Sequence, residues 1–221
     1  MSVTEPVTDT PIPTFTSVDP TTGEALGEFP FHGDSDVLAA VDAARIAARW
    51  WADLGFTGRK RRLMAWKAVM ARRAEQLATL VQREQGRPVD DALVEIILSI
   101  EHINYAAARA HKTLGERRVR PGLLTTNQAA TLSYEPLGVI GVIGPWNYPV
   151  FTPIGSIAYA LAAGNAVVYK PSEFAPAVGQ WLVDTFAQVV PEQPVLSLIT
   201  GDGTTGAALC RSGVDKLSFT G

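Results

Sequence analysis

The second half of the chain repeats a pattern of buried strands and apolar helices. Gly138 to Ile143 alternates glycine with β-branched residues, which is typical of a strand buried on both faces of a parallel sheet. The same reasoning predicts four strands, at 138–143, 166–169, 195–199 and 216–219. The segments between them are predicted to be helical at about 153–163, 176–190 and 204–210. Gly164-Asn165 supplies a stop signal for the first of these helices.

The first half is predicted to begin with a small hairpin and to continue with helices. Thr14 to Phe31 holds two short extended segments around a turn signal at Asp19 to Gly23. Apolar residues then recur at helical spacing, which predicts helices at about 34–54 and 57–85 and a third that opens at Pro88. Asp34-Ser35-Asp36 is expected to cap the first helix. We expect the interior of the third helix to contain Val94, Ile97, Leu98, Ile100, His102 and Tyr105.

These elements together predict the fold class. The repeated strand-helix unit indicates an α/β protein with a doubly wound parallel sheet and right-handed crossovers, covered by the helices of residues 34–112. Residues 117–134 are expected to form a β-hairpin that projects from the body, and residues 1–13, which lack periodicity, a disordered N-terminus. The last strand reaches the final residues, where an α/β domain normally continues. We therefore expect the sequence to be incomplete at its C-terminus.

Composition limits the cellular location and the partners that we expect for the protein. The 221 residues are 47% hydrophobic and carry a formal net charge of −3, which gives no support for binding nucleic acid. A single cysteine cannot form an intramolecular disulfide, and the sequence shows neither a signal peptide nor a membrane-spanning stretch. We therefore expect a cytoplasmic protein without a membrane partner. His102 and His111 have no cysteine or carboxylate at metal-ligand spacing, so no metal site is predicted.

Polar residues gather where the predicted strands end, and ligands of open α/β sheets bind outside the carboxyl ends of the strands. Lys170 and Glu173 could bind the hydroxyls of a ribose, and the loop Gly201-Asp202-Gly203 lets a flat group approach the backbone. Asn147 could donate its amide hydrogens to a developing oxyanion. Taken alone, the glycine loop and the asparagine are each explained better by a tight turn. The residues alone therefore indicate a nucleotide-binding α/β domain.

Four segments, in this order and spacing, resemble the aldehyde dehydrogenase superfamily: GVIGPWNYP, LAAGNAVVYKPSE, GDGTTGAAL and DKLSFTG. The resemblance runs from about Val18 onward and implies that residues 14–221 form part of a Rossmann-like NAD(P)-binding domain. In such enzymes a cysteine thiolate attacks an aldehyde, hydride passes to NAD(P)⁺, and water activated by a glutamate hydrolyses the thioester. The resemblance thus implies an oxidoreductase that converts a small aldehyde to a carboxylate, with NAD, or alternatively NADP, as cofactor.

The resemblance also assigns roles to individual residues. Asn147 matches the oxyanion-hole asparagine and is the one catalytic residue assigned. The implied cofactor-binding residues are Ile143, Gly144, Pro145, Trp146, Lys170, Ser172, Glu173, Gly203, Gly206, Phe219, Thr220 and Gly221. Of these, Lys170 and Glu173 match the ligands of the adenosine ribose. Residues 117–134 match the oligomerisation hairpin of the family, which implies a homodimer or homotetramer for the complete protein.

The chain departs from the family pattern because two catalytic residues of the family, a cysteine and a glutamate, are not found in it. The nucleophilic cysteine and the glutamate base have no match in these 221 residues, so the chain by itself is expected not to oxidise aldehydes. Cys210 follows the GDG loop, which is one residue shorter than the commonest pattern, and is expected to be a small packed residue. Two alternatives stay open. One is a nucleotide-binding or assembly module without turnover, and the other is an acylating, coenzyme A-dependent or acyl-phosphate-reducing relative.

Overall fold

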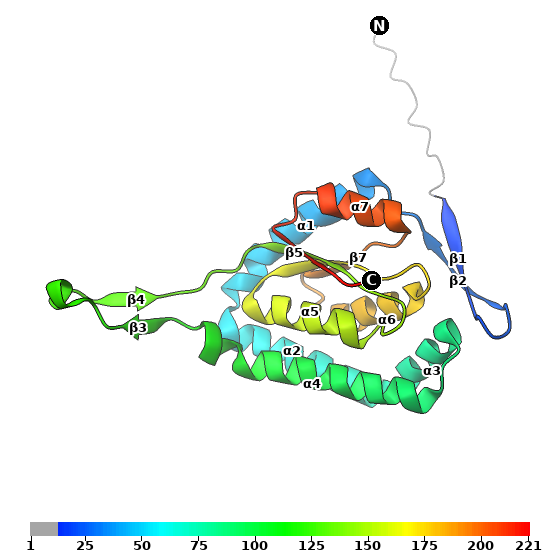
Figure 1. Ribbon diagram of the computed structural model, residues 1–221, viewed down its shortest axis with the longest axis horizontal. Coiled ribbons are helices and arrows are strands. Elements are labelled where there is room, and N and C mark those ends of the chain that lie inside the picture. Colours follow the sequence, from blue (N-terminus) through cyan, green and yellow to red (C-terminus); the bar gives the residue numbers. More distant parts are fainter. Residues whose placement is uncertain (1–12) are drawn as a thin grey trace, which may run out of the picture.

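The centre of the protein is a parallel sheet in the order β7-β6-β5-β8 (Figure 1). The computed structural model describes residues 13–221, and the disorder expected for residues 1–13 lies outside this range except at Pro13. The four strands are β5 (Val139–Ile143), β6 (Ala166–Lys170), β7 (Leu196–Leu198) and β8 (Lys216–Phe219). The chain moves outward from β5 to β7 and then returns to place β8 on the other side of β5. This reversal confirms the predicted doubly wound α/β fold.

Helices cover both faces of this sheet (Figure 1). On one face lie α5 (Phe151–Ala163) and α6 (Pro176–Ala187), and on the other lie α1 (Asp34–Asp53) and α7 (Gly203–Arg211). A further layer packs on α5 and α6 and consists of α2 (Gly55–Arg72), α3 (Ala74–Gln85) and α4 (Val89–Leu114). Of the helices of residues 34–112, only α1 lies directly on the sheet, which corrects the expectation that all of them would.

Two helix boundaries also differ from the predictions. The helix expected at 57–85 is broken at Arg73, whose φ of −113° and ψ of 21° are not helical. The break redirects the chain so that α3 packs against α6 and β1 as well as α4. The N-cap residue of the first helix is Gly33, and of the residues expected to cap it Asp36 takes part, because its carboxylate accepts from the backbone N–H of Gly33 at 2.9 Å.

The buried face of α4 differs from the one predicted, of which only Ile100 and His102 are partly buried. Val94, Ile97, Leu98 and Tyr105 are exposed. The buried residues of α4, which packs against α2, α3 and α5, are mostly small or polar, namely Ala92, Glu95, Ile96, Ser99, Ile103, Ala106 and Ala107. Small side chains let helices pack closely, so they occupy these contacts in place of the larger ones. Glu95 therefore lies in the protein interior.

Two hairpins complete the described chain, as predicted. β1 (Thr14–Val18) pairs with β2 (Ala25–Pro30), and β3 (Arg117–Val119) pairs with β4 (Ala130–Leu132), both antiparallel. The second hairpin projects far from the sheet, and the short 3₁₀ turn η1 (Leu123–Thr125) lies at its tip (Figure 1). Within residues 13–221, none of the helices combines the length and the hydropathy needed to span a membrane.

Candidate functional site

The carboxyl ends of three strands bring the predicted cofactor residues together. Ile143 is paired in register with Lys170 on β6 and with Phe219 on β8. A cavity of about 570 Å³ opens at this point. Eleven of the twelve predicted residues line it: Ile143, Pro145, Trp146, Lys170, Ser172, Glu173, Gly203, Gly206, Phe219, Thr220 and Gly221. Gly144 does not, because it is buried against Pro153 and Tyr169.

Lys170 and Glu173 form the charged edge of this cavity. The Lys170 side chain is almost completely buried, and its ammonium donates to the carbonyl of Pro171 at 3.0 Å. Burial lowers the pKa of Lys170, while the negative charges of Glu173 and Asp202 oppose this effect. The hydroxyl of Ser172 lies 3.4 Å from a carboxylate oxygen of Glu173, to which it donates. An ammonium and a carboxylate side by side can bind the two hydroxyls of a sugar.

The first residue of α7, Gly203, forms part of the cavity wall with its backbone alone. Asp202 caps this helix by accepting from the N–H of Thr204 at 2.8 Å, and the bond lowers the pKa of Asp202. A Cβ atom at Gly203 would have no neighbour within 4 Å, and the φ of Gly203 is not positive. Packing and backbone geometry within the chain therefore do not require glycine at this position. Bare backbone beside open space suits close contact with a flat ligand.

The sequence reasoning missed four residues that line the same cavity: Phe174, Ala207, Cys210 and Leu217. Phe174 is exposed directly after Glu173, and an aromatic residue next to a candidate ribose ligand is a signal that could have been used. Cys210 is exposed on the cavity wall, which corrects the expectation of a packed residue. The buried face of α7 instead contains Thr205, Gly206, Ala208 and Leu209.

Asn147 lies in the turn after β5, between this cavity and a second one. Its carbonyl oxygen Oδ1 accepts from the N–H of Tyr148 at 3.0 Å, so the NH₂ end of the amide is the part that can donate to a ligand. The second cavity has a volume of about 770 Å³. It is lined by Arg87, Asp91, Val94, Glu95, Leu98, Asn147, Tyr148, Phe151 and Thr152. Trp146 borders the first cavity and Asn147 the second, so this turn has one cavity on either side.

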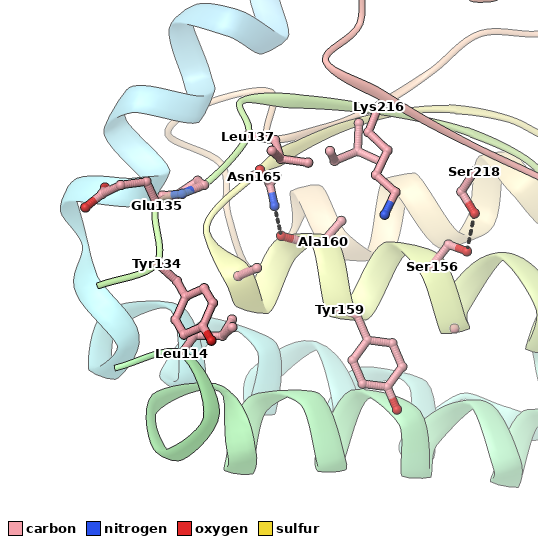
Figure 2. A pocket seen from close by; sticks show the side chains of 14 residues that line it. Leu114, Tyr134, Glu135, Leu137, Ser156, Tyr159, Ala160, Asn165, Lys216 and Ser218 are labelled. Carbon is pink, nitrogen blue, oxygen red and sulfur yellow. Dashed lines mark hydrogen bonds between the residues drawn. The ribbon is translucent and has the colours of Figure 1, made fainter. Parts of the chain in front are cut away.

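A further cavity of about 430 Å³ lies beside α5, near the amino ends of β5 and β8 (Figure 2). None of the predicted site residues lines it. Its polar side chains are partly paired within the chain: Ser156 and Ser218 share a hydrogen bond of 2.8 Å, and Asn165 donates to the carbonyl of Ala160 (Figure 2). Within residues 13–221 there is no group of three His, Cys, Asp or Glu side chains that could hold a metal ion.

Comparison with known proteins then decides the family. The model of the family described as "Aldehyde dehydrogenase family" matches residues 7–221. The chain belongs to the aldehyde dehydrogenase family. The resemblance stated from the four motifs is thereby confirmed.

Several relatives of this aldehyde dehydrogenase chain are similar over most of its length. An N-succinylglutamate 5-semialdehyde dehydrogenase of Burkholderia mallei is 37% identical over 210 residues, which are 95% of this chain and 42% of the relative. The NAD⁺ complex of an aldehyde dehydrogenase from Bacillus cereus has a TM-score of 0.87 at 28% identity. The match covers 95% of this chain and 43% of that one. An NADP-dependent glyceraldehyde-3-phosphate dehydrogenase from Bacillus halodurans, complexed with NADP, has a TM-score of 0.87 at 28% identity. This match covers 94% of this chain and 44% of that one. The chain thus spans less than half the length of these relatives.

Proposed function

We propose that this chain forms the cofactor-binding part of an NAD(P)-dependent aldehyde dehydrogenase. The observation that carries the proposal is the cavity at the ends of β5, β6 and β8, which gathers eleven residues from four separate segments of the sequence. Its volume of about 570 Å³ lies within the usual range of ligand sites, and its wall combines a buried lysine, a carboxylate and bare backbone. The solved relatives bound to NAD⁺ and NADP support the same assignment.

In this proposal Lys170 and Glu173 bind the ribose hydroxyls of the adenosine. Ser172 donates to the Glu173 carboxylate at the edge of the cavity. Trp146, Phe174 and Phe219 offer exposed aromatic surface on the cavity wall, against which flat rings can pack. A bound NAD(P)⁺ would supply the hydride acceptor.

Asn147 is proposed to stabilise the negative charge that develops on the aldehyde oxygen. The hydrogen bond from Tyr148 to Oδ1 fixes the amide and leaves its NH₂ as the donating end. The aldehyde would approach through the neighbouring cavity of about 770 Å³, whose wall contains Val94, Leu98 and Phe151. Cys210 is not proposed as the nucleophile, because it borders the cofactor cavity rather than the cavity beside Asn147.

The hairpin of β3 and β4 is proposed to carry contacts between copies of the protein in a homodimer or homotetramer. Leu123 and Leu124 are almost fully exposed at its tip, and such leucines are favourable to bury in an interface. A cytoplasmic location is proposed as well, which agrees with a single cysteine in the whole chain.

A titration with two lysine variants tests the proposed cofactor site. NAD⁺ should quench the fluorescence of the exposed Trp146 in the chain of residues 1–221, and Lys170→Met should weaken binding by about tenfold or more, because it removes charge-assisted hydrogen bonds. Lys216→Met is the matched control, since Lys216 borders the cavity beside α5. Equal NAD⁺ affinity in all three proteins would refute the site. The full-length gene product, assayed with NAD⁺ and short aldehydes, tests the oxidation separately.

A further inference from the structure

The connection between α3 and α4 holds the backbone of the turn that carries Asn147. The side-chain amide of Gln85 donates to the carbonyl of Trp146, and the guanidinium of Arg87 donates to the carbonyl of Asn147 at 3.3 Å. The Arg87 guanidinium also lies over the ring of Tyr148, 5.4 Å from its centroid. Arg87 therefore contacts the residue that donates the oxyanion hydrogen bond and the residue that fixes its amide.

Glu95 holds the other side of the same turn from within α4. One of its carboxylate oxygens accepts from the N–H groups of Val150 and Phe151, at 2.8 and 2.9 Å. These N–H groups belong to the first turn of α5, where backbone donors lack partners within the helix and a negative charge is favourable. Glu95 thus fixes the end of the segment that begins at Trp146.

Arg87 and Glu95 also pair with each other through the second carboxylate oxygen of Glu95. The Glu95 side chain is 1% exposed and that of Arg87 is 18% exposed. A buried carboxylate without a cation would be strongly unfavourable, so each residue depends on the other. Burial lowers the pKa of Arg87, and the nearby groups Tyr148 and Asp91 oppose this effect. The two residues therefore act as one unit, with contacts to the turn at both of its ends.

We propose that the Arg87–Glu95 pair is a positioning device for Asn147. The pair does not line the cofactor cavity; it borders the neighbouring cavity together with Asn147 and sets where the Asn147 amide lies. Oxyanion donors must lie within about 0.5 Å of their productive position, so a turn that moves by more would lose most of their effect. The inference rests on the proposed function, because it requires Asn147 to donate to the oxyanion.

A double-mutant cycle tests this role in the full-length gene product. The readout is kcat at saturating NAD⁺ with the best substrate among short aldehydes. Asn147→Ala should lower kcat by about a hundredfold to a thousandfold, and Arg87→Met by about tenfold or more, with the KM for NAD⁺ unchanged. If Arg87 acts through Asn147, Arg87→Met should change kcat by less than about twofold once Asn147 is already alanine. Arg87→Lys, which keeps the charge beside Glu95, should regain part of the lost kcat.

Arg45 on α1 provides a matched control, because its ion pair supports the start of β5, whereas the turn that carries Asn147 follows the end of β5. It pairs with Asp215 at 2.9 Å and donates to the carbonyl of Gly213, while Asp215 accepts from the N–H of Val139 at the start of β5. Arg45→Met should lower the melting temperature but change kcat per folded molecule by less than about twofold. If Arg87→Met does not fold, Arg87→Lys takes its place in the cycle.

The possible outcomes separate this inference from the proposed function. If Asn147→Ala lowers kcat but Arg87→Met lowers it by the same factor in both backgrounds, the positioning role is wrong and the proposed function stands. The same holds if Arg87→Met leaves kcat unchanged. If Asn147→Ala itself retains kcat, the oxyanion assignment fails, and the positioning role fails with it.

Discussion

The ammonium nitrogen of Lys170, the last residue of β6, lies 3.9 Å from a carboxylate oxygen of Glu173, three residues further along the chain. Their side chains differ in exposure, at 4% for Lys170 and 37% for Glu173. Lys170 is held by its surroundings, whereas Glu173 stands at the edge of the cavity and can move toward solvent. Glu173 is therefore the residue of this pair that a cofactor substituent would meet first.

The first prediction is a preference for NAD over NADP in the full-length gene product. A 2′-phosphate on the adenosine ribose would face Glu173, and two unit charges about 4 Å apart repel by roughly 4 kcal/mol at an effective dielectric near 20. Since Glu173 can swing away, we expect a smaller preference, of about tenfold or more in kcat/KM. Glu173→Gln should reduce it, while Glu192→Gln, which removes an exposed carboxylate paired with Arg62, should not. Equal kcat/KM for both cofactors in the wild type would contradict the prediction.

The candidate cofactor site could be predicted because parallel strands end at one edge of the sheet. Once Gly138–Ile143, Ala166–Tyr169 and Lys216–Phe219 are recognised as neighbouring parallel strands, the residues that follow them must meet. The structure shows this arrangement, because Ile143 at the end of β5 is paired with Lys170 on β6 and with Phe219 on β8. The strand pattern alone thus brings these residues to one edge of the sheet, and the family motifs add the proposed roles.

The residues that support Asn147 could not be predicted in the same way. α4 is apolar on two faces, and its larger residues, such as Val94 and Ile97, are exposed. Packing against α2, α3 and α5 selects the face with small side chains, which is a property of the neighbouring helices and not of α4 alone. Glu95 on that face was the available signal, because a charged residue in line with Ala92 and Ser99 is expected to have a buried partner. Arg87 was recognisable only after the fold had placed it beside Tyr148.

The second prediction concerns the oligomeric state of the full-length gene product. If the hairpin of β3 and β4 joins copies of the protein, Leu123→Asp together with Leu124→Asp should shift the molar mass in solution toward the monomer, because charges would enter the interface. Ile46→Asp, at an exposed position on α1, is the matched control and should leave the mass unchanged. Light scattering after size-exclusion chromatography measures both. A double variant with the wild-type mass would show that the hairpin is dispensable for assembly.

The third prediction is a pH dependence of stability that arises from Glu84. This buried carboxylate accepts from the N–H groups of Ala177 and Val178 at the start of α6 and from the hydroxyl of Ser17. Burial raises the pKa of Glu84, and these three hydrogen bonds oppose the rise only in part. The folded state therefore holds this proton more tightly than the unfolded state does. The resulting stability is fully present below the unfolded pKa and is lost as the pH rises through the folded pKa.

Unfolding by urea at several pH values between about 4.5 and 7.5 measures this effect. The free energy of unfolding should fall with rising pH more steeply in the wild type than in Glu84→Gln, which cannot ionise at this position. Glu24→Gln, an exposed carboxylate on the surface, should keep the wild-type slope. Parallel curves for the wild type and Glu84→Gln would rule out Glu84 as the source.

The fourth prediction concerns the thiol of Cys210 in the chain of residues 1–221. Cys210 is exposed on the wall of the cofactor cavity together with Gly206 and Phe219, so a bound dinucleotide should cover it. Saturating NAD⁺ is expected to slow labelling by a thiol reagent by about tenfold or more, because a covered thiolate reacts poorly. It is the single cysteine of these 221 residues, so the labelling rate reports this position alone. Lys170→Met should bind NAD⁺ more weakly. A higher NAD⁺ concentration should therefore be needed to slow the labelling of Cys210 in this variant.

The same thiol also tests whether this chain oxidises aldehydes by itself. Covalent catalysis requires a thiolate within bonding reach of the carbonyl and beside the oxyanion donor. Cys210 lies on the cofactor cavity and Asn147 on the neighbouring one, so the two residues do not flank a common space for the aldehyde. Absorbance at the NADH band should therefore show no turnover of short aldehydes by residues 1–221, either in the wild type or in Cys210→Ser. Turnover that disappears in Cys210→Ser would identify Cys210 as a nucleophile, and turnover that survives it would refute the requirement for a thiol.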